Sequence, residues 1–103
     1  KNIKIKFVTG VFEIPNIISR NIKKFDAFIA LGCVIKGKTD HYHYICSAVT
    51  NGLMKISIES TKPIGFGILT CNNIKQAKQR ASIHKKNKGK EVALGIISIL
   101  KNK

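Results

Sequence analysis

Acidic residues are scarce in this chain: five Asp and Glu stand against 19 Lys and Arg, a formal charge of +14 at pH 7. Such an excess of cations would suit a nucleic-acid partner, because lysine and arginine displace counterions from phosphates. The cations are nevertheless spread along the chain among many Asn and Ile residues, a composition that an AT-rich genome also produces. Nucleic-acid binding is therefore the less favoured interpretation of this charge.

Long hydrophobic runs and cysteine motifs are lacking as well. The apolar stretch "AFIALGCVI" falls far short of the roughly 20 residues that span a bilayer. Cys33, Cys46 and Cys71 form an odd set without the CxxC spacing of zinc sites, which indicates reduced thiols used as small core residues. We therefore expect a soluble, cytoplasmic protein with no membrane partner. Its 103 residues and 44% hydrophobic content predict a single domain over residues 1–103.

The first third of the chain predicts a strand, a helix and a second strand. Residues 3–8, "IKIKFV", alternate apolar and basic side chains, as a strand with one exposed face does. Pro15 suits the first turn of a helix, which apolar residues at helical spacing extend to residue 25. The continuous apolar run at 27–35 is typical of a strand that is buried on both faces.

The rest of the chain repeats this alternation. A helix is expected from Thr39 or Asp40, as the cap, to about residue 60, and a buried strand follows at 63–70. Asn73 and Gln76 are spaced like a capping box at the start of the next helix, and "GKEVALGIISIL" (89–100) predicts the last one. The order predicts an α/β fold with three layers, α/β/α, around a parallel sheet. Ligands of such folds bind beyond the carboxyl ends of the strands.

Two histidines, His41 and His43, lie at one of these strand ends in "GKTDHYHYI" (37–45). On a helix their side chains point in nearly opposite directions and no cysteine or carboxylate completes a set of three ligands, which disfavours a metal site. His41, in the first turn, is the better candidate for proton transfer, while an ordinary solvated or core histidine is the default for His43. The preceding Lys38 and Thr39 could hold a phosphate at the helix N-terminus, or form a plain turn.

Charged residues near the other strand ends have two possible uses. Glu13, after Phe12, could accept hydrogen bonds from a hydroxyl-rich ligand, or only favour the first turn of its helix. A basic group follows the third strand and could bind an anion, although solvated side chains are its usual explanation; it comprises Arg80, Lys85, Lys86, Lys88 and Lys90.

Together these stretches resemble the lumazine synthase family. The resemblance lies in "GVFEIP" (10–15), "LGCVIKGKTDHYHYI" (31–45), "PIGFGILTCNNIKQAKQRA" (63–81) and "NKGKEVAL" (87–94), four blocks in the family's order. It implies a flavodoxin-like topology and a cofactor-free condensation of 5-amino-6-(D-ribitylamino)uracil with 3,4-dihydroxy-2-butanone 4-phosphate, the penultimate step of riboflavin biosynthesis. A non-catalytic shell or assembly protein of the same fold is the alternative.

The resemblance also implies the roles of individual residues. His41 moves protons, and His43 stands where the family has an acid or another polar residue. Phe66 would be contributed to the site by an adjacent subunit. Arg80 would bind the phosphate, with Lys88 near it. The remaining substrate-binding residues are Val11, Phe12, Glu13, Cys33, Val34, Ile35, Lys38 and Thr39.

The family's assembly and missing elements are further expectations. The resemblance implies a homo-oligomer, either a pentamer or an icosahedral assembly of pentamers, with riboflavin synthase as a candidate partner. Family members carry a first strand and a helix before the point that corresponds to Lys1, and that strand belongs between 3–8 and 27–35. We therefore expect this chain to be an N-terminally incomplete piece of its gene product.

Overall fold

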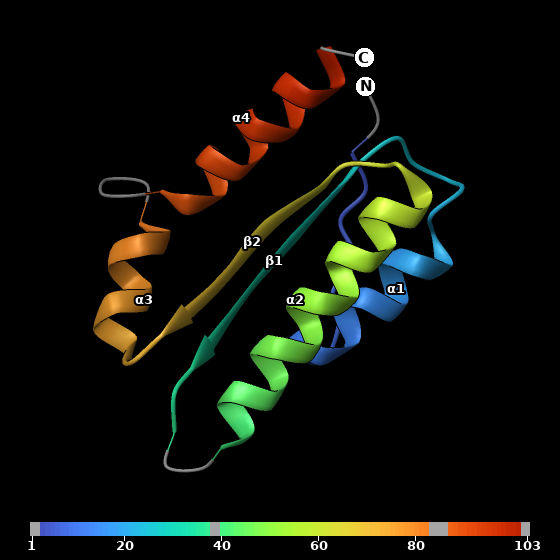
Figure 1. Ribbon diagram of the computed structural model, residues 1–103. Coiled ribbons are helices and arrows are strands. Elements are labelled where there is room, and N and C mark those ends of the chain that lie inside the picture. Colours follow the sequence, from blue (N-terminus) through green and yellow to red (C-terminus); the bar gives the residue numbers. More distant parts are fainter. Residues whose placement is uncertain (1–2, 38–39, 83–86, 102–103) are drawn as a thin grey trace.

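The chain folds into helices on both sides of a two-stranded parallel sheet (Figure 1). A computed structural model describes residues 3–37, 40–82 and 87–101. α1 and α2 cover one face of the sheet, and α3 and α4 lie on the other. This arrangement confirms the α/β fold with three layers. The elements are η1 (Val11–Glu13), α1 (Ile14–Arg20), β1 (Phe28–Ile35), α2 (His41–Ser60), β2 (Ile64–Cys71), α3 (Ile74–Ala81) and α4 (Lys88–Lys101).

The two strands pair in parallel from Phe28 opposite Ile64 to Ile35 opposite Cys71. α2 connects them across one face, as parallel neighbours require. The core fills the space between this face and the helices α1 and α2, and its apolar side chains recur at the spacing of each element. Its buried residues are Ile14, Ile18, Ala30, Val49, Leu53 and Ile68.

Glycines allow α4 to approach β2 on the opposite face. A Cβ atom at Gly65 would lie 2.5 Å from Cγ1 of Val92, and one at Gly67 would lie 2.6 Å from Cδ2 of Leu31. Both distances are far below ordinary carbon contacts of about 3.5–4.0 Å. Gly65 therefore sets how closely α4 sits on the sheet, whereas Gly67 makes room for the Leu31 side chain of β1.

The prediction of a strand at residues 3–8 is wrong for this structure. The segment has no regular secondary structure, and no backbone hydrogen bond from it to another described residue is present. Ile3, Ile5 and Phe7 are 87%, 75% and 94% exposed. An alternating pattern forms a strand only when a neighbouring edge is within hydrogen-bonding distance, and here none is.

The prediction that the 27–35 strand is buried on both faces is also wrong. Side chains at alternate positions of β1 face the α4 side, where Ile29, Leu31 and Ile35 are 43%, 62% and 40% exposed. α4 packs mainly over β2, where Gly65 admits its side chains Val92 and Ile96. One face of β1 is therefore open.

Helix α1 ends at Arg20, five residues earlier than its apolar spacing predicts. The side-chain Nδ2 of Asn21 donates to the Ile17 carbonyl at 2.7 Å and replaces the next helical bond. Beyond it, Lys62 Nζ donates to the carbonyls of Ile22 and Phe25, which turn toward this cation. A side chain 40 residues away thus fixes the backbone after the helix.

Candidate active site

The carboxyl ends of the two strands lie side by side and define one edge of the molecule. The backbone N–H of Lys36, just after β1, donates to the Cys71 carbonyl at 2.8 Å. Beyond β1 the chain leads into the N-terminus of α2, and beyond β2 into that of α3 (Figure 1). Two helix N-termini therefore meet two strand ends, the arrangement in which α/β folds bind their ligands.

His41 is the first residue of α2 and is exposed at this edge. Asp40 is the N-cap residue, as one of the two alternatives predicted, but its side chain makes no capping hydrogen bond; its carbonyl accepts the N–H of His43 at 3.0 Å. The predicted phosphate-side residues Lys38 and Thr39 lie outside the described part of the chain. The edge therefore presents His41 beside the N-terminal end of a 20-residue helix.

His43 has a different environment from His41. Its ring packs edge to face on Tyr42, with ring centroids 5.1 Å apart. The helical placement of both histidines is confirmed. Within the described ranges, no group of three His, Cys, Asp or Glu side chains could hold a metal ion.

Arg80 is held against the end of β2. Its Nη1 donates to the Thr70 carbonyl at 3.2 Å and lies 3.7 Å from Cys71 Sγ. The predicted capping box fixes the helix that carries it, because Asn73 Oδ1 accepts the N–H of Gln76 at 2.9 Å. Among the described residues, the guanidinium of Arg80 makes its hydrogen bonds through Nη1 alone. Nε and Nη2 therefore have no partner in the described part of the chain.

The contact between Arg80 and Cys71 was not expected from the sequence, which indicated only a small core residue at Cys71. That side chain is indeed buried, at 1% exposure, yet its sulfur is next to the guanidinium. The signal that could have revealed this is positional: Cys71 is the last residue of its strand, on the edge toward which the following helix begins.

Cys33, Val34 and Ile35 form the end of β1. Cys33 is exposed, yet its pKa is raised above the ordinary 9.0. The largest cause is desolvation of its thiol, followed by the Coulombic effect and the hydrogen bond of Cys71. It is therefore a neutral thiol near pH 7. Val34 packs against the core, and Ile35 is 40% exposed. This strand end offers an uncharged, largely apolar surface.

The η1 turn lies over the middle of β1. Val11 Cγ2 lies 3.0 Å from the position of a Cβ atom at Gly32, so a larger residue there would require the Val11 side chain to shift. Phe12, at 56% exposure, and Glu13 remain at the surface, where Glu13 Oε1 accepts from Thr9 Oγ1 at 3.3 Å. The turn thus brings an aromatic ring and a carboxylate beside the strand.

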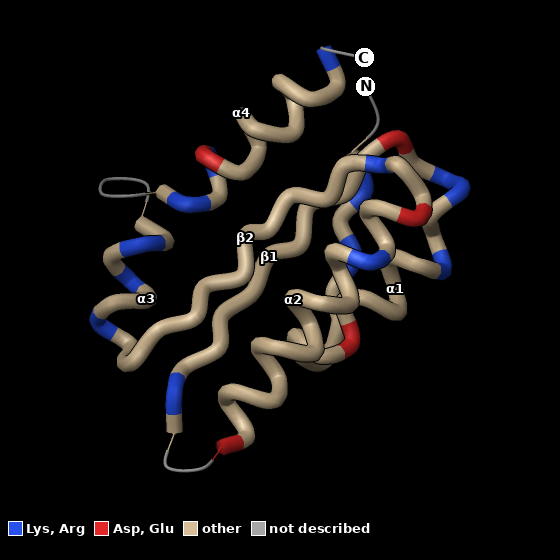
Figure 2. Tube along the Cα trace, viewed as in Figure 1, with Lys and Arg blue, Asp and Glu red and all other residues tan. Residues whose placement is uncertain are grey.

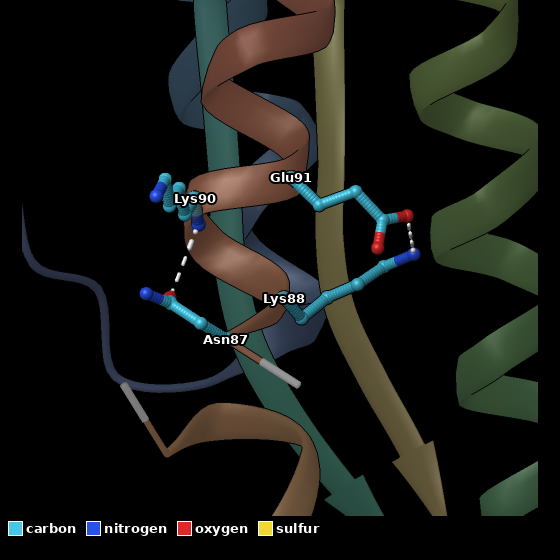
Figure 3. A network of polar contacts seen from close by, with 4 residues as sticks. All are labelled: Asn87, Lys88, Lys90 and Glu91. Carbon is cyan, nitrogen blue, oxygen red and sulfur yellow. Dashed lines mark hydrogen bonds and ion pairs between the residues drawn. The ribbon is translucent and has the colours of Figure 1, made fainter. Parts of the chain in front are cut away.

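Two predicted residues are not brought to this edge by contacts within the chain. Phe66 pairs with Ala30, five residues before the end of β2, which corresponds to roughly 16 Å along the strand. Lys88 Nζ instead pairs with Glu91 Oε1 at 3.0 Å in an exposed ion pair, while Asn87 Oδ1 accepts the N–H of Lys90 (Figure 3).

The charge of the molecule is uneven around the site. α3 carries Lys75, Lys78 and Arg80 without an acidic residue, whereas four of the five acids lie outside α3 and α4 (Figure 2). Nearby cations raise the local concentration of anions. Arg80 therefore lies on a helix whose field attracts negatively charged ligands.

The fold and the site together define an α/β protein whose parallel sheet carries His41 and Arg80 at its carboxyl edge. Comparison with protein families gives a match over residues 1–103, and the chain belongs to the 6,7-dimethyl-8-ribityllumazine synthase family. This is a family of transferases of riboflavin biosynthesis. No helix in the described ranges is long and apolar enough to cross a membrane.

Proposed function

We propose that this chain condenses 5-amino-6-(D-ribitylamino)uracil with 3,4-dihydroxy-2-butanone 4-phosphate to give 6,7-dimethyl-8-ribityllumazine. The amine of the pyrimidine attacks the ketone, water is lost to give an imine, phosphate leaves, and ring closure releases a second water. Each step moves protons. The observation that carries the proposal is the sheet edge at which α2 presents His41 and the end of β2 anchors Arg80.

Arg80 is proposed to bind the phosphate of the butanone substrate. Its anchored Nη1 orients the guanidinium, and Nε and Nη2, which make no hydrogen bond with described residues, provide the two parallel donors that bind a phosphate. The cations of α3 and the N-terminus of α2 add a positive field. Lys38 and Thr39 are proposed to complete the phosphate side, with Lys88 near it after its exposed pair with Glu91 opens.

The pyrimidine is proposed to lie against η1 and the end of β1. Phe12 would pack on the ring and Glu13 would accept hydrogen bonds from the ribityl hydroxyls, while Val11 lines the pocket beside the strand. The neutral thiol of Cys33 together with Val34 and Ile35 suits an uncharged ring. Phe66 would serve the site of a neighbouring subunit, because it lies far from this edge in its own chain.

His41 is proposed to carry protons between the substrates during imine formation and elimination. His41→Ala should lower kcat by about 10²–10⁴-fold with little change in pyrimidine affinity, because a proton carrier acts on the barrier. His43→Ala is the matched control, since its ring packs on Tyr42. Lumazine formation is followed by absorbance and fluorescence. Equal losses in the two variants would contradict the role of His41. If the unmodified protein gave no rate above the uncatalysed reaction, the alternative of a non-catalytic assembly protein would be favoured.

The anion site is tested with the only two arginines of the chain, Arg20 and Arg80. Arg80→Lys should raise the KM for the butanone phosphate and spare pyrimidine affinity, because lysine cannot form two parallel bonds. Arg20→Lys is the control, since Arg20 Nε donates to Asn16 Oδ1 on α1. An unchanged KM in Arg80→Lys would show that the guanidinium is a structural residue of α3.

Assembly is part of the same proposal. We infer a cytoplasmic homo-oligomer, a pentamer or an icosahedral assembly of pentamers, with riboflavin synthase as a candidate partner. Exposed apolar side chains on α2 and α4 support association between subunits; they include Tyr44, Met54, Ile58, Leu94 and Ile99. Activity should fall when subunits dissociate with each chain still folded. Fully active monomers in a sedimentation experiment would refute the sharing of Phe66.

A further inference from the structure

Two cysteines meet near the carboxyl ends of the paired strands. The parallel register places Cys33 of β1 opposite Leu69, and Cys71 of β2 opposite Ile35. Directly paired residues point to the same face of a sheet, as do residues two apart on one strand. Both cysteine side chains therefore point to the face that carries α3 and α4 (Figure 1). Their thiols are hydrogen-bonded to each other, so the sheet holds two sulfur atoms side by side.

A cation lies beside this pair. Arg80 Nη1 donates to Cys71 Sγ at 3.7 Å and to the Thr70 carbonyl at 3.2 Å, and the two bonds together fix its position. Cys71 is 1% exposed, so its sulfur interacts with the guanidinium away from bulk water, where salt screens charges least. The pair of sulfur atoms therefore has a built-in counter-ion for any bound species of negative charge.

We propose that Cys33 and Cys71 form a dithiol site for one soft monovalent metal ion of the class of Cu(I), with Arg80 as its counter-ion. Thiolates are the ligands that select such ions. Each thiol gives its proton to the solvent when it binds. Two neutral thiols and one monovalent cation thus yield two protons and a bis-thiolate complex with a charge of −1, which the guanidinium neutralises.

A divalent ion fits this dithiol site less well. Zn(II) takes four ligands in structural sites, and in the described ranges no group of three His, Cys, Asp or Glu side chains could hold a metal ion. A divalent ion between two thiolates would also give a neutral complex, which would leave the charge of Arg80 uncompensated beside it. The ligand number and the charge both favour a monovalent ion.

A disulfide also suits the two cysteines less well. They are diagonal neighbours on the two strands, and the Cα atoms of such neighbours lie about 7–8 Å apart. A disulfide joins Cα atoms up to about 7 Å apart without backbone movement. A metal ion replaces the one sulfur–sulfur bond by two metal–sulfur bonds, and this longer bridge spans the strands as they stand.

Titration of the reduced protein with Ag(I) tests this proposal, because Ag(I) is a soft monovalent ion that air does not oxidise. One ion should bind tightly, with the near-ultraviolet absorbance of thiolate-to-metal charge transfer and the release of two protons in a pH-stat. Cys33→Ser should weaken this binding by at least about a hundredfold, since even the loss of an outer partner costs about 10–100-fold. Cys46→Ser, at a half-buried position of α2, is the matched control and should leave it unchanged.

The counter-ion is tested by a second pair of variants. Arg80→Met should weaken Ag(I) binding by about tenfold or more, whereas Arg20→Met should not, because Arg20 Nε donates to Asn16 Oδ1 on α1. Equal effects of the two substitutions would overturn the role of Arg80.

Three other results would overturn the dithiol site itself. Release of a single proton for each bound ion would show that only one thiol binds. An affinity that depends on Cys46 and not on Cys33 would place the ion on α2. Displacement of Ag(I) by an equal concentration of Zn(II) would show a site that further ligands complete, in place of two thiolates.

Discussion

Replacing Gly65 by alanine should destabilise the protein through a collision with α4. The added Cβ would lie 2.5 Å from Val92 Cγ1, 3.0 Å from Ile96 Cγ1 and 3.4 Å from Ile29 Cγ1. Ordinary contact requires Val92 to move by about 1 Å. Overpacking of this kind costs about 1–3 kcal/mol, against which alanine recovers about 0.4–1 kcal/mol through the unfolded chain. We expect a net loss of about 1–2 kcal/mol.

A double-mutant cycle identifies the collision as the cause. Val92→Ala alone should cost about 1 kcal/mol, because Val92 is half-buried and loses two methyl groups. In Gly65→Ala/Val92→Ala the new methyl group occupies the space that valine vacates. The double variant should therefore be more stable than the sum of the single changes predicts, by about 1 kcal/mol.

Urea unfolding followed by far-UV circular dichroism measures these changes, since the chain has no tryptophan for fluorescence. Gly95→Ala is the control: nothing lies within 4 Å of its Cβ position on α4, and it should stabilise the helix by up to about 1 kcal/mol. If Gly65→Ala left the free energy of unfolding unchanged and showed no coupling to Val92→Ala, the packing of α4 on β2 would be refuted, and with it the position of Lys88.

Three further changes test other features. Lys62→Met should lower the free energy of unfolding by about 1–3 kcal/mol, because two backbone carbonyls after α1 lose their donor. The control Lys55→Met, at an exposed position, should change it by less than about 0.5 kcal/mol. Equal effects of the two substitutions would refute the role of Lys62 in holding these carbonyls. Thr61→Gly should raise stability by up to about 1 kcal/mol, since a β-branched residue there has φ 59°, and a loss in the same urea assay would contradict that strain. The raised pKa of Cys33 favours its neutral thiol in the folded state, so this contribution is complete below pH 9.0 and is lost as pH rises through the higher folded pKa. As pH rises above 9.0, the free energy of unfolding of wild type should therefore fall more than that of Cys33→Ala. Parallel curves of stability against pH for the two proteins would refute this contribution.

Much of the candidate site could be predicted because its signals are local. Parallel strands joined by helices must end at one edge, and His41 and Arg80 follow such strand ends in the sequence. The sequence could not predict which nitrogen of Arg80 is already hydrogen-bonded within the chain. Its partners, the Thr70 carbonyl and the Cys71 sulfur, lie nine or ten residues away on another element.

The sequence by itself determined the elements whose signals lie within a few residues. Period 3.6 in α2, the Asn73–Gln76 capping box and the apolar run of β2 are short-range patterns, and each appears where its pattern predicts it. The tertiary structure decided the features that depend on residues far apart in the sequence. Lys62 fixes the backbone after α1, Gly65 of β2 lets α4 pack closely on that strand, and residues 3–8 lack the neighbour that would make them a strand. The physical reason is that a strand or a helix end needs hydrogen-bonding partners, which residues far along the sequence provide only after the chain has folded.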